Sequence, residues 1–190
     1  VRTRSPYEIR IGKGLLDEIG TVLAARFGIV RVVVVTDHTV EKLYGGALIS
    51  SLTNAGLKAE TYVFPSGEVS KNFAVLESLL HFLAQREITR ADIVLALGGG
   101  VTGDLAGFAA AIYMRGIRFV QIPTTLLAAV DSSVGGKTAI NLGKIKNLVG
   151  AFHQPSFVLC DTDLLASLPT EIIADGMAEV IKYGLLGDKE

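Results

Sequence analysis

Short apolar runs alternate with longer segments of helical spacing along this chain. Three runs, at residues 32–35, 93–97 and 119–122, are aliphatic and β-branched in character and are bounded by turn or polar residues. Such runs are typical of strands covered on both faces, as in a parallel sheet. Between them, apolar positions recur at intervals of three and four over residues 15–27 and 73–83. The alternation predicts βαβ units, and therefore an α/β fold with a Rossmann-like, doubly wound parallel sheet.

Turn residues predict where two of the helices begin. Pro65, Ser66 and Gly67 are expected to open the helix that runs to Leu83. A second helix is expected over residues 104–114, directly after a glycine cluster. No internal repeat or low-complexity tract is visible in the sequence.

A last helix is expected after Pro169, with Thr170 as its N-cap. Its predicted apolar stripe consists of Ile173, Met177, Val180 and Ile181. The sequence ends soon afterwards at Glu190. Because an apolar helix face needs a partner to cover it, we expect a Rossmann-like domain over residues 1–168. Residues 169–190 would then be the first helix of a helical C-terminal domain that is mostly absent from this sequence.

The composition excludes several classes of protein. With 49% apolar residues the chain can bury a full core, and its longest apolar stretch, residues 105–114, is shorter than the roughly 20 residues that a membrane span needs. No targeting segment is visible, so a cytoplasmic protein is expected. Cys160 is the only cysteine and is expected to be a small core residue. A net charge of −1 argues against nucleic acid as a partner.

The distribution of charged residues along the chain is more informative than the net charge. Residues 105–160 contain a single acidic residue, Asp131, and five basic ones: Arg115, Arg118, Lys137, Lys144 and Lys146. This local excess of positive charge predicts an anionic ligand such as a phosphate ester.

A glycine cluster at residues 98–103, GGGVTG, satisfies the pattern G-x-G-x-x-G between a predicted strand and a predicted helix. Residues without Cβ let the backbone approach a pyrophosphate at a helix N-terminus, although a tight βα turn explains the pattern equally well. The dinucleotide fingerprint also needs an acid about 20 residues on, and residues 105–130 contain none. Asp37, at the end of the first predicted strand, is therefore the ribose candidate, and it can also cap the following helix.

A second glycine cluster, Gly135-Gly136-Lys137-Thr138, resembles a Walker A loop only superficially. That motif needs glycine where this chain has Asp131, so a P-loop nucleotide hydrolase is disfavoured. The two glycines give Lys137 backbone freedom, which favours a functional role for this lysine over a surface one.

Six strings in order, GGGVTGD, MRG, IPTT, VDSSVGGKTAIN, KNLVGAFHQP and AEVIKYG, closely resemble the 3-dehydroquinate synthase family. The resemblance runs from Asp37 to the end of the chain. It implies a phosphate-eliminating lyase of the shikimate pathway of aromatic amino-acid biosynthesis. The family converts 3-deoxy-D-arabino-heptulosonate 7-phosphate to 3-dehydroquinate and phosphate, uses NAD and a divalent metal, zinc or cobalt, and forms a homodimer.

The resemblance also implies which residues bind NAD. In addition to Asp37, these are Ser66, Gly67, Glu68, Lys71, Gly99, Gly100, Val101, Thr102, Gly103, Asp104, Thr124, Thr125, Lys137, Lys146 and Ser167. Glu68 and Lys71 would reach the adenosine side of the cofactor. Ser66 replaces the family's usual aspartate, and Ser167 stands where threonine is commoner.

For the substrate, the family's phosphate and hydroxyl contacts match Arg115, Asp131, Lys137, Asn147 and Lys182. Arg115 would act across the dimer interface.

Glu179 matches the family's single metal-ligand carboxylate, although a surface ion pair with Lys182 would explain the same spacing. The family's other two ligands are histidines further downstream, and His38, His81 and His153 match neither of them. His81 and His153 are expected to be structural.

Three alternatives remain open on the sequence. Other sugar-phosphate cyclases, such as 2-deoxy-scyllo-inosose synthase or a valiolone-type synthase, use the same cofactor and metal. Glycerol and iron-containing alcohol dehydrogenases share the architecture but fit the motifs poorly. The chain could also be a non-catalytic NAD-binding module, and the isolated 190 residues are expected to be inactive because metal ligands are missing.

Overall fold

A six-stranded parallel sheet forms the centre of the protein. The computed structural model describes residues 6–187, and its sheet has the strand order β1-β8-β5-β4-β2-β3. The strands are β1 (Glu8–Gly12), β2 (Arg31–Asp37), β3 (Lys58–Phe64), β4 (Ile93–Gly98), β5 (Arg118–Pro123) and β8 (Phe157–Asp161). The predicted α/β class and parallel sheet are confirmed.

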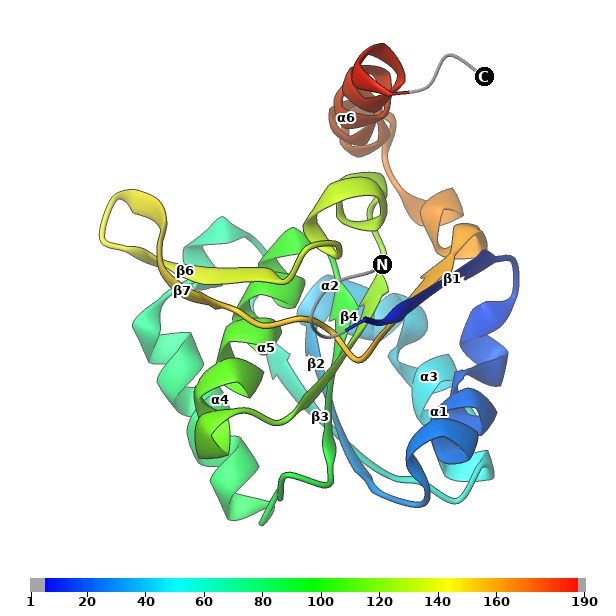
Figure 1. Ribbon diagram of the computed structural model, residues 1–190, viewed down its shortest axis with the longest axis vertical. Coiled ribbons are helices and arrows are strands. Elements are labelled where there is room, and N and C mark those ends of the chain that lie inside the picture. Colours follow the sequence, from blue (N-terminus) through cyan, green and yellow to red (C-terminus); the bar gives the residue numbers. More distant parts are fainter. Residues whose placement is uncertain (1–5, 188–190) are drawn as a thin grey trace.

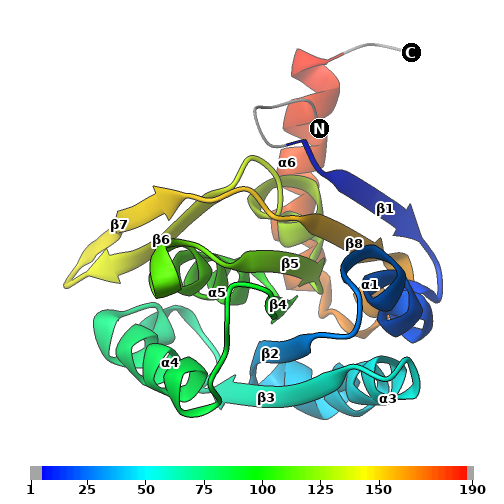
Figure 2. The same cartoon turned by 60° about the horizontal axis from the view of Figure 1, so that its bottom comes forward.

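Helices cover both faces of the sheet, which gives three layers (Figures 1 and 2). One face carries α4 (Phe73–Gln85) and α5 (Gly100–Ile112), and the other carries α1 (Ile19–Phe27) and α3 (Gly46–Asn54). Short helical segments join these elements: η1 (Leu15–Glu18), α2 (His38–Val40), η2 (Glu41–Gly45), η3 (Glu68–Ser70), η4 (Tyr113–Arg115), η5 (Ala128–Ser132) and η6 (Thr162–Ser167).

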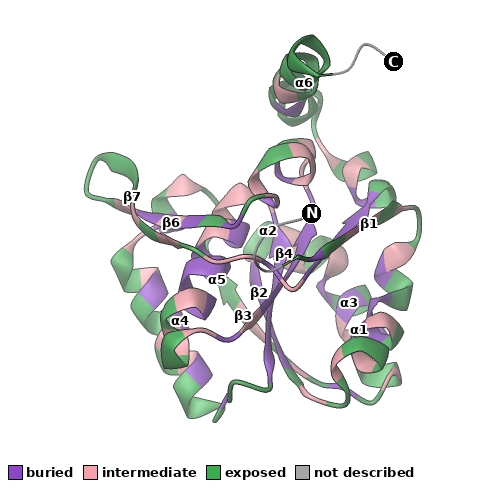
Figure 3. Ribbon diagram, viewed as in Figure 1, coloured by how far each residue is buried: buried purple, intermediate pink, exposed green. Residues whose placement is uncertain are grey.

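The central strands β2, β4 and β5 are buried along nearly their whole length, as their apolar runs predict (Figure 3). Side chains alternate between two cores. Val33 and Val94 lie with α4 and α5, whereas Val34 and Leu95 lie with α1 and α3. Cys160 is buried beside Tyr7, as expected of a core residue.

Three predicted helix boundaries are wrong. Helix α4 begins at Phe73, because the side chain of Asn72 caps it by accepting from the N–H of Val75. Helix α5 begins at Gly100 and ends at Ile112, so the glycine cluster supplies its first turn instead of preceding it. Helix α6 (Thr170–Leu186) has Pro169 in the N-cap position, and Thr170 is its first helical residue.

A two-stranded antiparallel hairpin, β6 (Lys137–Leu142) and β7 (Ile145–Phe152), packs on α5 outside the main sheet. It was not predicted. Close approach requires glycine in the helix: a Cβ at Gly107 would lie 2.4 Å from Thr138 Cγ2. The hairpin places Lys137 and Asn147 beside the helix that begins in the glycine cluster.

Helix α6 extends away from the main body (Figure 1). Its Gly176 packs against Leu126, where a Cβ would lie 2.6 Å from Leu126 Cβ. Its apolar residues are exposed, as the predicted stripe implies: Ile172, Ile173, Met177, Val180, Ile181, Leu185 and Leu186. Among residues 6–187, no helix has the length and apolarity that crossing a membrane requires.

Candidate functional site

The first candidate site lies where the direction of the chain through the sheet reverses. From β2 the chain continues to β3 on one side, and from β4 it continues to β5 on the other. In open α/β sheets, the carboxyl ends of strands at such a point form a ligand-binding crevice. A cavity of about 470 Å³ opens there. Ten of the predicted cofactor residues line it: Asp37, Ser66, Gly67, Gly99, Gly100, Val101, Thr102, Thr124, Thr125 and Ser167.

The turn from β4 into α5 forms one wall of this cavity. A Cβ at Gly98 would lie 2.4 Å from Thr102 Oγ1, so this position excludes larger residues. Gly99 occupies the N-cap position without a side-chain cap, and the first i−4 bond of the helix runs from Gly103 N to Gly99 O. The earlier N–H groups of a helix have no intrahelical partners and favour an anion. The backbone therefore fits a diphosphate.

Asp37 ends β2 and caps the next helical segment, as one of its two predicted roles requires. Its Oδ1 accepts from the N–H groups of Thr39 at 2.8 Å and Val40 at 3.1 Å, and from the hydroxyl of Ser66 at 2.7 Å. Within the described part of the chain, no hydrogen bond reaches Oδ2. Oδ1 of Asp37 thus stabilises the local backbone of the cavity wall, and Oδ2 can accept a hydrogen bond from a ligand hydroxyl.

Tyr44 lines the same cavity, although it was not identified from the sequence. Its hydroxyl lies 2.8 Å from the carbonyl of Leu164 and 2.5 Å from Ser167 Oγ. This contact fixes the segment that precedes α6 against the segment that follows β2. The cavity therefore spans the junction between residues 1–168 and the last helix.

A second cavity, of about 340 Å³, lies between α5 and the β6–β7 hairpin. Three predicted site residues line it: Asp104, Lys137 and Asn147. Gly135 and Gly136 both adopt positive φ angles, 92° and 69°, which explains why glycines precede Lys137. The exposed ammonium group of Lys137 at the mouth of a small cavity suits an anionic group.

Lys71 lies beside the second cavity and does not line the first one. It is only 4% exposed, and its ammonium contacts the side chains of Asp104 and Asn147. Burial raises the pKa of Asp104 above its ordinary value, against the opposing effect of Lys71. Its side chain points toward the second cavity. The predicted contact of Lys71 with adenosine stays a prediction.

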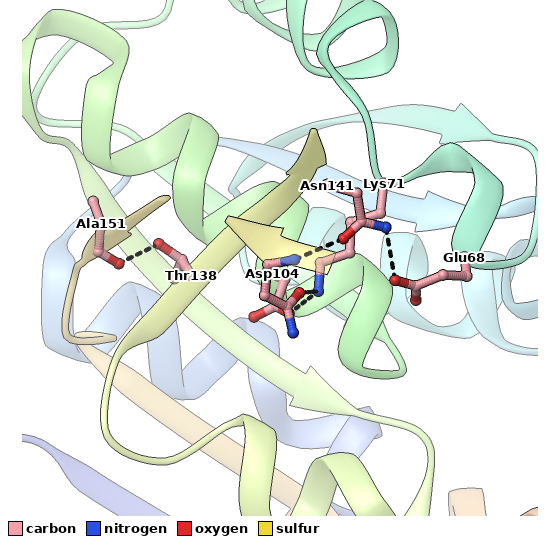
Figure 4. Close-up of polar contacts among 7 residues, drawn as sticks. Glu68, Lys71, Asp104, Thr138, Asn141 and Ala151 are labelled. Carbon is pink, nitrogen blue, oxygen red and sulfur yellow. Dashed lines mark hydrogen bonds and ion pairs between the residues drawn. The ribbon is translucent and has the colours of Figure 1, made fainter. Parts of the chain in front are cut away.

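Around Lys71, a polar network joins four segments (Figure 4). Glu68 Oε1 accepts from Asn141 Nδ2 at 2.8 Å, and Asn141 Oδ1 accepts from the N–H of Asn147 at 2.9 Å. Asn141 was not identified from the sequence. The KTAIN string contains it, but nothing in the local pattern distinguishes this asparagine from a surface residue.

The remaining substrate and metal candidates lie at η5 and α6. The hydroxyl of Tyr183 donates to Asp131 Oδ1 at 3.0 Å, and Lys182 forms an ion pair with Glu179. The hydrogen bond with Asp131 raises the pKa of Tyr183. In residues 6–187, no group of three or more histidine, cysteine or acidic side chains is placed to hold a metal ion. Glu179 therefore lacks the partners that a three-ligand site would need within this part of the chain.

Arg115 and Lys146 line neither cavity. Arg115 follows the C-terminal end of α5, the end opposite the glycine turn, and is exposed with a φ of 65°. Lys146 is exposed on β7. His153 Nε2 donates to the carbonyl of Ile117 at 2.9 Å and its ring stacks on Phe119, contacts that suit the structural role expected of it. His81 is exposed.

The sequence pattern of the family described as 3-dehydroquinate synthase N-terminal matches residues 61–175. Over 183 residues the chain is 54% identical to the 3-dehydroquinate synthase of Paracoccus denitrificans and 56% identical to that of Caulobacter vibrioides. Each alignment covers 96% of this chain and 50% of the relative. The chain thus spans about half the length of these relatives.

Solved structures with similar folds include two sugar-phosphate cyclases. A 2-deoxy-scyllo-inosose synthase complexed with carbaglucose-6-phosphate, NAD+ and Co2+ is 30% identical with a TM-score of 0.86, covering 93% of this chain and 47% of that one. The 2-epi-5-epi-valiolone synthase of Streptomyces hygroscopicus, with NAD+ and Zn2+ bound, is 31% identical with a TM-score of 0.86, covering 96% and 50%. On the family match and the fold together, this chain belongs to the 3-dehydroquinate synthase family.

Proposed function

We propose that the 470 Å³ cavity binds NAD, with the diphosphate at the N-terminus of α5 and a ribose hydroxyl on Asp37. The observation that carries this proposal is the uncapped helix N-terminus beside a glycine turn, facing a carboxylate with one unused oxygen. Both cyclases with similar folds are described with NAD+ bound. When bound, NAD supplies a reversible hydride acceptor.

The second cavity, in this proposal, holds the phosphorylated part of a sugar-acid substrate. Lys137 supplies the positive charge and Asn147 supplies amide hydrogen bonds, while the surrounding segment carries few acids. The chain would then be half of a 3-dehydroquinate synthase, which eliminates phosphate from 3-deoxy-D-arabino-heptulosonate 7-phosphate and forms a carbocycle. Holding successive intermediates in one pocket raises their effective concentration for ring closure.

Asp131 and Lys182 would orient the reacting hydroxyls from η5 and α6. The contact of Tyr183 with Asp131 supports a joint role for Asp131 and Lys182, because this contact holds α6 beside the segment that carries Asp131. Residues 1–168 would form the cofactor domain, and residues 169–190 would begin the domain that completes the site. Arg115, which is exposed and lines neither cavity, would serve the second subunit of a homodimer.

Glu179 would contribute one ligand to a zinc or cobalt site in the complete enzyme. Within residues 6–187 the donor set does not fit a metal ion, since Glu179 belongs to no group of three or more potential ligands. A three-ligand catalytic metal site needs further donors. We therefore derive no step of the reaction through the metal from this chain, and we expect the 190-residue chain alone to be inactive.

A hybrid protein tests the proposed activity. Residues 1–190 would replace the matching half of the Paracoccus denitrificans relative, and phosphate release from the heptulosonate phosphate would be measured with NAD and zinc. We expect turnover that Lys137→Ala abolishes while NAD affinity is retained. A folded, NAD-binding hybrid that releases no phosphate would contradict the proposal. Turnover with a hexose 6-phosphate alone would favour the alternative, a 2-deoxy-scyllo-inosose-type cyclase, which the fold similarity also supports.

A further inference from the structure

Asn141, on β6, contacts residues 68–71 and also Asn147, which lines the second cavity. Its Nδ2 donates to Glu68 Oε1 at 2.8 Å, and its Oδ1 accepts from the N–H of Asn147 at 2.9 Å. Its own N–H donates to the carbonyl of Lys71 at 2.9 Å. Two of these bonds join residues 68–71 to the hairpin, and the third joins β6 to β7 (Figure 4 draws the two side-chain bonds).

An irregularity in the hairpin makes these contacts possible. The pairing of β6 with β7 shifts register between Ile140 and Leu142, so Asn141 has no place in the regular ladder. The backbone N–H and C=O groups of a strand residue normally form hydrogen bonds with the neighbouring strand. At a bulge, one residue is left out of that pairing, and its backbone groups are available for other contacts. The backbone N–H of Asn141 donates to Lys71 and its side chain donates to Glu68, and both partners belong to a different part of the fold.

The main consequence concerns Asn147. Its φ of 55° lies in the left-handed region, where asparagine is tolerated but not strongly held. The side chain of Asn141 fixes its N–H, and Lys71 fixes its side-chain oxygen. The conformation of this cavity-lining residue therefore depends on contacts made by residues 68–71. Those residues lie directly after Ser66 and Gly67, which line the other cavity.

We propose that Asn141 is a positioning residue that couples the NAD cavity to the anion cavity by transmitting the position of the 66–71 segment to Asn147. The inference rests on the proposed function, since it takes NAD and phosphate as the two ligands. Coupling between two sites is reciprocal: each ligand must raise the affinity for the other by the same factor. A coupling factor of about five to ten is expected for a few hydrogen bonds.

A purely structural brace would behave differently. Loss of a brace lowers the stability of the fold and weakens both ligands, but it leaves the ratio between affinities with and without the second ligand unchanged. The coupling factor is therefore the quantity to measure. Calorimetry of NAD binding to the chain, with and without inorganic phosphate as the probe, gives that factor directly.

Exchanging donor and acceptor gives the sharpest variants. Asn141→Asp keeps the acceptor for Asn147 N–H but places a carboxylate against Glu68 Oε1. Glu68→Gln with Asn141→Asp restores one donor and one acceptor with the direction of the bond reversed. We expect the coupling factor to fall to about one in Asn141→Asp and to recover to at least half its original value in the double variant. Asn54→Asp, on an exposed helix end, is the matched control and should leave the factor unchanged.

A measurement on the unaltered chain protects the test against misfolded variants. The amide resonance of Asn147 should move when NAD is added in the absence of phosphate, whereas that of Asn54 should not. An unchanged coupling factor in a folded Asn141→Asp, or a stationary Asn147 resonance at saturating NAD, would overturn the inference. If NAD and phosphate bind the unaltered chain without coupling, this inference alone fails. If NAD does not bind at all, the proposed function fails with it.

Discussion

Substitution of Asp37 by asparagine separates its two roles. Oδ1 makes all three internal contacts, with Thr39 N, Val40 N and Ser66 Oγ, while Oδ2 has no partner within residues 6–187. Asparagine keeps an oxygen acceptor for the cap, so the free energy of unfolding should change by less than about 1 kcal/mol. It replaces the second, charged oxygen by an amide that cannot accept from a ribose hydroxyl.

The expected loss of NAD affinity follows from the charged hydrogen bond. Such bonds contribute about 1.5–3 kcal/mol, which corresponds to a roughly 10- to 150-fold rise in Kd. Asp37→Ala should lose the same affinity and also about 1 kcal/mol of stability, because the cap is removed. Calorimetry measures the Kd for NAD, and urea unfolding measures the stability.

The control and the refuting result are both definite. Asp17→Asn changes an exposed carboxylate at another helical turn, on the opposite side of the sheet from α4 and α5. It should alter neither the Kd for NAD nor the free energy of unfolding. Unchanged NAD affinity in a folded Asp37→Asn would refute the assignment of this carboxylate to the cofactor. The glycine turn would then have to bind its ligand without an acidic partner.

Three further predictions concern one residue of the glycine turn and two buried side chains elsewhere in the fold. Gly98→Ala should cost about 1–3 kcal/mol and weaken NAD binding, since the new Cβ would lie 2.4 Å from Thr102 Oγ1; Gly46→Ala, in open space on α3, is the control and should not destabilise the fold. Asp92→Ala should lose about 2–3 kcal/mol at neutral pH in urea unfolding. Despite burial, hydrogen bonds from Thr89 and Arg31 hold the pKa of Asp92 below 3.8, so its contribution is present above that pH and should vanish as the pH falls through the lower folded-state value. Burial raises the pKa of Cys160 to about 11, so alkylation of the native chain at pH 8 should be about a thousandfold slower than for a fully ionised thiol, and fast alkylation would contradict the buried placement.

The parts of the fold that the sequence predicted are those whose signal is local. The runs at 32–35, 93–97 and 119–122 are buried on both faces, and their continuous apolar character identified them. Strand β8 is equally buried and carries a similar apolar run, but it was not predicted. Strand β1 carries mostly exposed or half-buried residues, so no comparable signal exists. The β6–β7 hairpin depends on contacts with α5, such as Thr138 against Gly107, which join distant positions in the sequence.

The same distinction holds for the candidate site. The glycine turn and Asp37 were identified because each follows a strand and precedes a helix, a context that the sequence itself displays. The burial of Lys71 could not be foreseen, because it depends on Asp104 and Asn147, which come from a helix and a hairpin far along the chain. Tyr183 was missed for the same reason, since its contact with Asp131 forms only when α6 packs beside η5.

A crystal structure of the chain grown with NAD tests the central claim most directly. We predict that the diphosphate lies against the N–H groups of Gly100, Val101 and Thr102, with a ribose hydroxyl on Asp37 Oδ2. NAD bound instead in the cavity of Lys137 and Asn147, with the glycine turn unoccupied, would contradict the account.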